Sequence, residues 1–187
     1  MKKPTIVNLF GGPGIGKSTA ATAVFSLLKM HGVDVEYVAE FAKDCTWEDR
    51  HTTLRNQYYI WAKQFHRIWR VQHKVDVIVT DPPPLLNLVY GDTPDSFKQI
   101  VLELFNNNDN INFLLQRITN YNEEGRNEIL PEARVIDNKV KNMLDSYKIT
   151  YSVITSDYKD INNVVSNVLE LFYIEHTLLI EDIIKEN

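Results

Sequence analysis

The segment from Gly11 to Ser18 has the residue types and spacing of a phosphate-binding loop, G-x-x-x-x-G-K-[ST]. Glycines let a backbone curl until successive N–H groups face one anion, and the helix expected next presents its positive dipole end to that anion. Lys17 can reach the β- and γ-phosphates, and the Ser18 hydroxyl is a ligand for Mg²⁺. The residues predicted to bind ATP and Mg²⁺ are Gly11, Gly12, Pro13, Gly14, Ile15, Gly16, Lys17, Ser18 and Thr19.

Two carboxylates follow segments that have the pattern of strands. Asp81 comes after the β-branched run ending at Thr80, and Glu40 comes after an alternating segment ending at Ala39. Asp81 can hold Mg²⁺ through water or orient a substrate hydroxyl, and Glu40 can accept the proton of an attacking hydroxyl. The structural alternatives are a turn-capping aspartate and a solvated loop charge. The sequence leaves open which of the two is the base.

A polar stretch after a further apolar run carries two arginines, Arg117 and Arg126. The planar guanidinium donates two hydrogen bonds to phosphate oxygens and keeps its charge. A segment carrying both arginines is expected to close over the triphosphate and exclude water. The alternative is an ordinary surface loop in which arginines pair with neighbouring acids.

The hydrophobic pattern alternates strands with helices. It predicts strands at Thr5–Phe10, Asp34–Ala39, Val75–Thr80, Ile111–Leu115 and Ile149–Thr155. It predicts helices at Lys17–Met30, Thr52–Lys74, Asp95–Phe105, Glu132–Tyr147, Ile161–Tyr173 and Thr177–Lys185. The alternation favours an α/β fold of the P-loop NTPase kind, a three-layer sandwich with a parallel sheet of about five strands and helices on both faces. In such sheets ligands bind beyond the carboxyl ends of the strands.

The helix predicted at Thr52–Lys74 carries aromatic residues at helical spacing. We assign Trp61 and Phe65 to the core, as is usual for such a stripe. Gln57, Tyr58 and Gln64 are candidates for lining a pocket in which an amide contacts the edge of a base and an aromatic ring stacks on it.

Length and composition limit the protein class. The chain has 187 residues, a length typical of one domain. It has one cysteine, Cys45, so no internal disulfide is expected, and its net charge is −5. The acidic balance argues against a broad nucleic-acid surface. We find no signal peptide and no apolar run near the ~20 residues that span a bilayer. The expectation is a protein without membrane contact in the cytoplasm, or in the host cytoplasm if the source is viral.

The assembled residues resemble the P-loop kinase branch that contains the nicotinamide riboside kinase domain of NadR-type proteins and phage ATPase-like kinases, and more loosely the deoxynucleoside kinases. The resemblance rests on Gly11 to Ser18, Glu40-Phe41-Ala42, the helix containing Gln57, Asp81, and Arg117…Tyr121…Gly125-Arg126. It implies ATP-dependent transfer of the γ-phosphoryl group to a nucleoside-like hydroxyl. Lys17, Glu40, Asp81, Arg117 and Arg126 would be catalytic, and Ser18 and Asp81 would hold the metal.

The resemblance also implies a domain plan and a set of partners. Residues 1–187 would form a single kinase domain with a lid segment near 117–133 and a C-terminal helical tail at 174–187. The partners would be a nucleoside triphosphate and a small-molecule hydroxyl acceptor, and the tail could pair with another subunit. Asp81 is followed by three prolines, where deoxynucleoside kinases usually carry an arginine and a serine, so the acceptor stays open.

Two other functions remain alternatives at this stage. One is a kinase that phosphorylates hydroxymethylated bases in DNA, a phage DNA modification. The other is a nucleotide-dependent ATPase or switch that transfers phosphate to no acceptor. Acceptor-dependent formation of ADP distinguishes the kinase with a small-molecule acceptor from the ATPase or switch.

Overall fold

The computed structural model describes residues 3–117 and 129–185, with side chains as far as residue 173. Five parallel strands form one sheet in the order β2-β3-β1-β4-β5. The strands are β1 (Thr5–Phe10), β2 (Val35–Val38), β3 (Val77–Thr80), β4 (Asp109–Leu115) and β5 (Ser152–Ile154). The predicted fold class is confirmed: an α/β sandwich with an all-parallel sheet.

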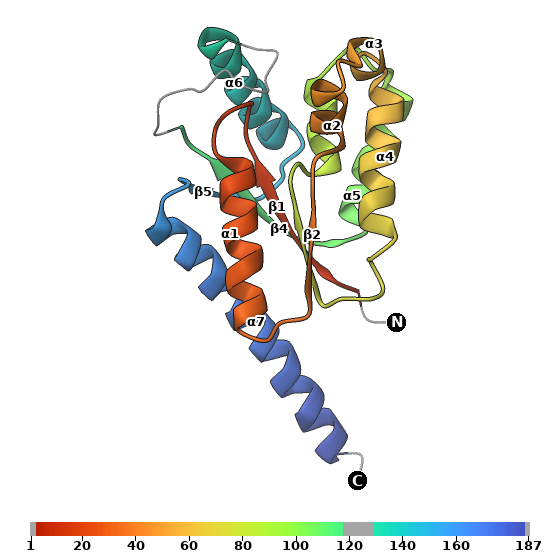
Figure 1. The fold of residues 1–187 in the computed structure, drawn as a ribbon. Coiled ribbons are helices and arrows are strands. Elements are labelled where there is room, and N and C mark those ends of the chain that lie inside the picture. Colours follow the sequence, from red (N-terminus) through yellow and green to blue (C-terminus); the bar gives the residue numbers. More distant parts are fainter. Residues whose placement is uncertain (1–2, 118–128, 186–187) are drawn as a thin grey trace.

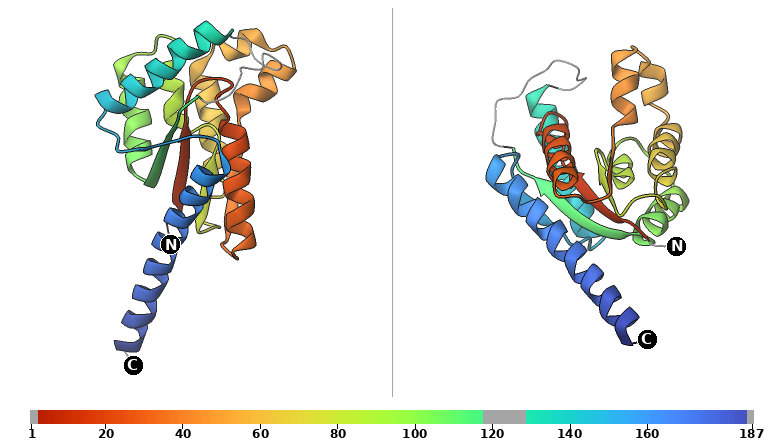
Figure 2. Two further views of the ribbon diagram at one scale, coloured as in Figure 1. Left: turned by 90° about the vertical axis from the view of Figure 1, so that its left-hand side faces the viewer. Right: turned by 60° about the horizontal axis from the view of Figure 1, so that its bottom comes forward.

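The helices cover both faces of the sheet (Figures 1 and 2). They are α1 (Lys17–Met30), α2 (Phe41–Trp47), α3 (His51–Leu54), α4 (Gln57–Trp69), the 3₁₀ helix η1 (Pro84–Val89), α5 (Asp95–Asn106), α6 (Leu130–Ser146) and α7 (Tyr158–Lys185).

The alternation of side chains along the central strand separates two hydrophobic layers. Val7 and Leu9 of β1 pack with α1 and α7 on one face. Phe10 packs on the other face with η1, α5 and α6, and Ile6 with α4. Successive side chains of a strand point to opposite faces, so a strand that is apolar at nearly every position is buried by helices on both sides.

The ends of the first strand and helix agree with the sequence prediction, but two helices differ. The predicted helix Thr52–Lys74 is divided: α3 ends at Leu54, and α4 begins only at Gln57. Asn56 caps α4, because its side-chain oxygen accepts a hydrogen bond from the backbone N–H of Tyr59 at 3.1 Å. Apolar spacing alone does not show this break.

At the C-terminus the sequence pattern predicted two helices, and the structure has one, α7, over 28 residues. Its first half packs on α1 through Ile161, Val164, Val165 and Val168. Its second half continues past the body of the domain (Figure 1). The stretch between Tyr173 and Thr177 lacks proline and glycine, and nothing in it ends a helix.

The strand order places the site. The connection that leaves β1 runs to β2 at one edge of the sheet, whereas the connection that leaves the neighbouring β3 crosses to β4 on the other side of β1. The two connections therefore diverge at the carboxyl ends of β1 and β3. Such a divergence leaves a crevice where parallel α/β sheets bind ligands. The segment Gly11–Gly16 leads from this point into α1. Within the part of the chain that was searched, no helix is long and apolar enough to cross a membrane.

Candidate functional site

The loop between β1 and α1 has the backbone of a phosphate-binding loop. Gly14 has φ 67° and Gly16 has φ 103°, in the left-handed region that favours glycine. A Cβ at Gly16 would also lie 2.8 Å from the Cβ of Ser156, so a larger residue is excluded there. These two glycines allow the chain to turn into α1 with the first N–H groups of the helix facing outward.

Lys17 opens α1 and curls back over the loop. It is 9% exposed, and its ammonium group donates a hydrogen bond to the carbonyl of Gly12 at 2.9 Å. An ammonium group has three donors, so two remain for phosphate oxygens. The loop therefore holds its cation beside the first turn of the helix.

A carboxylate from α6 supports the loop from behind. Oδ1 of Asp137 accepts a hydrogen bond from the Gly12 N–H at 2.9 Å and one from Arg117 at 3.1 Å. Arg117 also donates through Nε to Asp137 Oδ2 at 3.0 Å and through a terminal nitrogen to the Pro13 carbonyl at 2.9 Å. Arg117 thus lies against the loop and is not among the residues lining the cavity described below.

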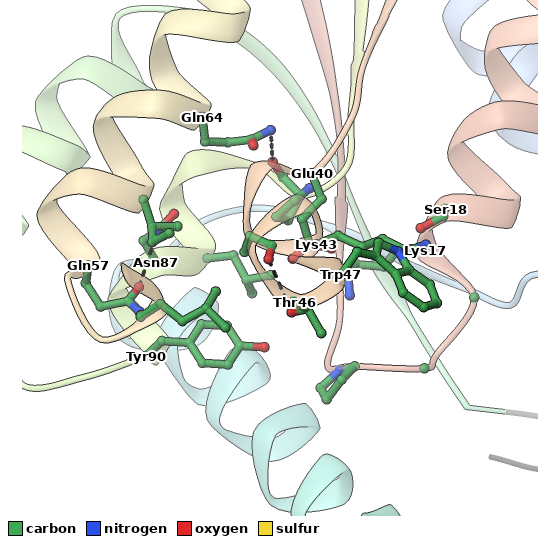
Figure 3. Close-up of a pocket in the computed structure, with 18 of the residues that line it drawn as sticks. Lys17, Ser18, Glu40, Lys43, Thr46, Trp47, Gln57, Gln64, Asn87 and Tyr90 are labelled. Atoms are coloured by element: carbon green, nitrogen blue, oxygen red, sulfur yellow. Dashed lines mark hydrogen bonds between the residues drawn. The ribbon is translucent and has the colours of Figure 1, made fainter. Parts of the chain in front are cut away.

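A single cavity of about 380 Å³ extends from the phosphate loop across the carboxyl ends of the strands (Figure 3). One end, called here the phosphate end, is lined by Pro13, Gly14, Gly16, Lys17, Ser18 and Thr19. Gly11, Gly12 and Ile15, which were also predicted to bind the nucleotide, are buried at the back of the loop. The far end, called here the amide end, is lined by Gln57, Asn87 and Tyr90.

The structure separates the two predicted strand-end carboxylates. Glu40 is half-buried at the start of α2 and lines the cavity between its two ends. Asp81 is 1% exposed and does not line it. Both carboxylates act on one phenol: burial, then the charges of Asp81 and Glu40, raise the pKa of Tyr37 well above its ordinary value. The protonated phenol donates to Asp81 Oδ2 at 3.5 Å.

Gln64 fixes the backbone around Glu40. Its amide oxygen accepts from the Phe41 N–H at 2.9 Å, and its amide nitrogen donates to the carbonyls of Ala39 at 3.3 Å and Pro82 at 3.2 Å. The side chain is 2% exposed. The sequence suggested Gln64 as a pocket residue; it does line the cavity, but its hydrogen bonds join the ends of β2 and β3.

The amide end is built from α4 and η1. Asn87 donates to the side-chain oxygen of Gln57 at 3.0 Å, and the Gln57 nitrogen donates to the Leu54 carbonyl at 2.7 Å. These bonds fix the orientation of both amides. Tyr58, the other predicted pocket residue on this helix, packs edge-on against Phe97 with ring centroids 4.8 Å apart and does not line the cavity.

The sequence analysis missed several cavity residues: Lys43, Thr46 and Trp47 on α2, and Asn87 and Tyr90 near η1. Asp44, on the same helix, forms an ion pair with Arg67. One signal existed for the three residues of α2: they follow Glu40 at positions 43, 46 and 47, a helical spacing. Arg126 lies outside the described residues.

Two oxygen donors at the carboxyl ends of β1 and β3 fit Mg²⁺ bound together with a triphosphate: one lines the cavity, and the other is buried outside its lining. The Ser18 hydroxyl lines the cavity. Oδ1 of Asp81 is buried and accepts no hydrogen bond from any residue described, as expected of an anionic oxygen that faces a hydrated cation. The searched residues hold no cluster of three His, Cys, Asp or Glu side chains. Mg²⁺ does not need one, because phosphate oxygens and water supply most of its ligands.

Comparison with known proteins supports the fold. The profile of the AAA domain family matches residues 6–160. A similar solved structure is that of deoxyadenosine kinase from M. mycoides with bound dATP: it shares 15% sequence identity with a TM-score of 0.53, over 90% of this chain and 99% of that chain. At this identity the similarity shows a kinase-like P-loop fold and nothing finer. No curated protein sequence gives a significant match.

Proposed function

The chain belongs to the AAA domain family, and from that premise we propose that it is an ATP- and Mg²⁺-dependent kinase that transfers the γ-phosphoryl group to a hydroxyl of a nucleoside- or nucleotide-like acceptor. The observation that carries the proposal is the continuity of the cavity, which joins the phosphate loop to the amide end past Glu40. A hydrolase or switch needs room for a nucleotide and a water molecule. This cavity offers a second set of polar groups at a distance from the loop.

The lining of the amide end supports a flat, polar acceptor. Gln57 and Asn87 present amides whose orientation is fixed by hydrogen bonds, and Tyr90 adds a phenol. Leu54, Ile60 and Leu86 provide apolar walls around them. Apolar walls with a few fixed polar groups are typical of small-molecule sites, and a nucleobase has both a flat face and a hydrogen-bonding edge.

The two carboxylates take different roles in this proposal. Glu40 lines the cavity and is the general base that accepts the proton of the acceptor hydroxyl. Asp81 is buried at the end of β3, outside the lining of the cavity, and would hold the metal through water, whereas the Ser18 hydroxyl would bind it directly. Bound Mg²⁺ supplies charge neutralisation at the phosphate oxygens. Lys17 stabilises the same oxygens from its position over Gly12.

The direct test is release of ADP from ATP and Mg²⁺ across a panel of nucleosides and nucleoside monophosphates, with hydroxymethylated DNA as a separate arm. We expect ADP formation that depends on one acceptor and a phosphorylated product that mass spectrometry identifies. Transfer of the γ-phosphoryl group to the hydroxymethylated DNA would assign the activity to the DNA-modifying alternative. Turnover at the same rate with and without every acceptor would replace the proposal with an ATPase or switch.

A further inference from the structure

Hydrogen bonds connect α6 to the lysine of the phosphate loop through one residue, Gly12. Asp137 on α6 accepts from the Gly12 N–H at 2.9 Å. The Gly12 carbonyl accepts a hydrogen bond from the Lys17 ammonium group at 2.9 Å. Gly12 is therefore held on both sides, by an anion behind the loop and by the cation in front of it.

The contact between Asp137 and Gly12 is close enough to fix the residue type at position 12. A Cβ on Gly12 would lie 2.3 Å from Oδ1 of Asp137 and 3.0 Å from the Ala133 carbonyl. Neither can retreat easily, since Ala133 belongs to the backbone of α6 and Asp137 is bonded to two groups. The loop pattern leaves position 12 variable, so the glycine is required here by the approach of α6.

Arg117 neutralises the carboxylate and extends its hold on the loop. Its side chain is 10% exposed and that of Asp137 is 22% exposed, so both charges are largely removed from water. It bonds both carboxylate oxygens and also donates to the Pro13 carbonyl, one residue beyond Gly12. Two-point pairing of this kind fixes orientation as well as distance.

We propose that Asp137 is a positioning residue for nucleotide binding, acting with Arg117 as one unit to hold the Gly12–Pro13 backbone so that Lys17 meets the phosphates. The inference rests on the nucleotide binding in the proposed function, but not on phosphoryl transfer. Asp137 touches neither nucleotide nor acceptor in this role. It fixes the backbone from which the phosphate-binding groups project.

The test measures the dissociation constant of Mg²⁺-ATP for the full chain without acceptor. Asp137→Ala is expected to weaken binding about tenfold, the effect of one lost charge-assisted hydrogen bond. Asp145→Asn removes the same charge from the exposed end of α6 and is expected to bind as the unaltered chain does. Where an acceptor is known, its KM should be unchanged in Asp137→Ala.

A second pair of variants tests the unit itself. Arg117→Gln and the double variant with Asp137→Ala are expected to bind Mg²⁺-ATP no more weakly than Asp137→Ala alone, because residues acting as a unit are not additive. If Asp137→Ala does not fold, Asp137→Asn serves in its place: its amide keeps an oxygen for the Gly12 N–H but loses the charge that pairs with Arg117, so binding of Mg²⁺-ATP is again expected to weaken. If Asp137→Ala binds Mg²⁺-ATP normally but has a lowered melting temperature, Asp137 has only a structural role. If the losses of affinity in the two single variants add up in the double variant, Asp137 and Arg117 do not act as one unit. If no acceptor in the panel is phosphorylated while the unaltered chain still binds Mg²⁺-ATP, only the proposed function is contradicted.

Discussion

The two ends of the cavity are built in different ways. The phosphate end comes from one continuous segment, Pro13 to Thr19, and uses backbone groups and one lysine. The amide end joins side chains of α4 and η1, which are separated by many residues in sequence and are held by bonds such as Asn87 to Gln57. The first arrangement suits a ligand common to many proteins. The second can change its ligand by changing side chains while the backbone stays as it is.

Because the two ends are built differently, we expect the effect of a substitution to depend on the end of the cavity at which it lies. Changes at the phosphate end should weaken the handling of ATP whatever the acceptor is. Changes at the amide end should alter only the choice and affinity of the acceptor. Glu40 lines the cavity between the two ends, and its substitution tests where the division falls.

The largest effect is expected from Lys17→Ala. Lys17 is the cation of the phosphate end and its substitution removes charge from both bound and transferring phosphates, so kcat/KM for ATP should fall about 10³-fold. Steady-state ADP release measures the loss. Lys139→Ala, on an exposed position of α6, is the matched control and should keep the activity of the unaltered chain. Retention of normal turnover by Lys17→Ala would show that the phosphate end is not the nucleotide site.

Glu40→Gln should come next and should affect rate without affecting nucleotide affinity. Loss of a general base lowers kcat about 10²- to 10³-fold, whereas the amide keeps the size of the side chain and so the shape of the cavity. Asp81→Asn is the informative partner: it should raise the Mg²⁺ concentration needed for half-maximal rate. If the two variants exchanged these phenotypes, Asp81 would be the base.

Asn87→Ala should raise the KM of the acceptor about tenfold and leave the KM of ATP unchanged. The reason is that Asn87 fixes the Gln57 amide, and a freely rotating amide binds a partner less well. Asn163→Ala, exposed on α7, controls for the loss of an asparagine. An equal rise in both KM values would show that the two ends of the cavity are not independent.

The same contrast explains how much the sequence could predict. The strand Thr5–Phe10, the helix Lys17–Met30 and the loop between them follow from local rules: apolar runs, glycines and a helix start. The all-parallel sheet followed from the alternation of elements. These features depend on residues that are neighbours in sequence.

Of the amide end, the sequence predicted Gln57 alone as a pocket residue, because the rest depends on which distant segments pack together. Asn87 and Tyr90 follow three prolines and had no recognisable pattern, yet η1 carries Asn87 to α4. The pairing of Arg117 with Asp137 was missed for the same reason. An arginine near a phosphate loop suggested a direct contact with phosphate, whereas its bonds in the structure run to Asp137 and the Pro13 carbonyl, and its predicted action on phosphate stays a prediction.

The smallest expected effect concerns Tyr37, whose phenol donates a hydrogen bond to Asp81. Burial and the charges of Asp81 and Glu40 raise its pKa above the ordinary 10.0, so the folded chain keeps a proton that the unfolded chain releases near pH 10. The unfolded state then binds fewer protons than the folded state, and the free energy of unfolding falls as pH rises above 10, by at most about 1.4 kcal/mol per pH unit for this group. Below pH 10 the contribution is complete.

Between pH 9 and pH 11, the free energy of unfolding should therefore fall less in Tyr37→Phe than in the unaltered chain. Urea unfolding measures this free energy at each pH, and the two pH values lie on either side of the ordinary tyrosine pKa of about 10. Tyr158→Phe, at a tyrosine that is 76% exposed on α7, should follow the unaltered chain. Identical pH dependence in all three proteins would mean that the pKa of the Tyr37 phenol is raised neither by burial nor by the charges of Asp81 and Glu40.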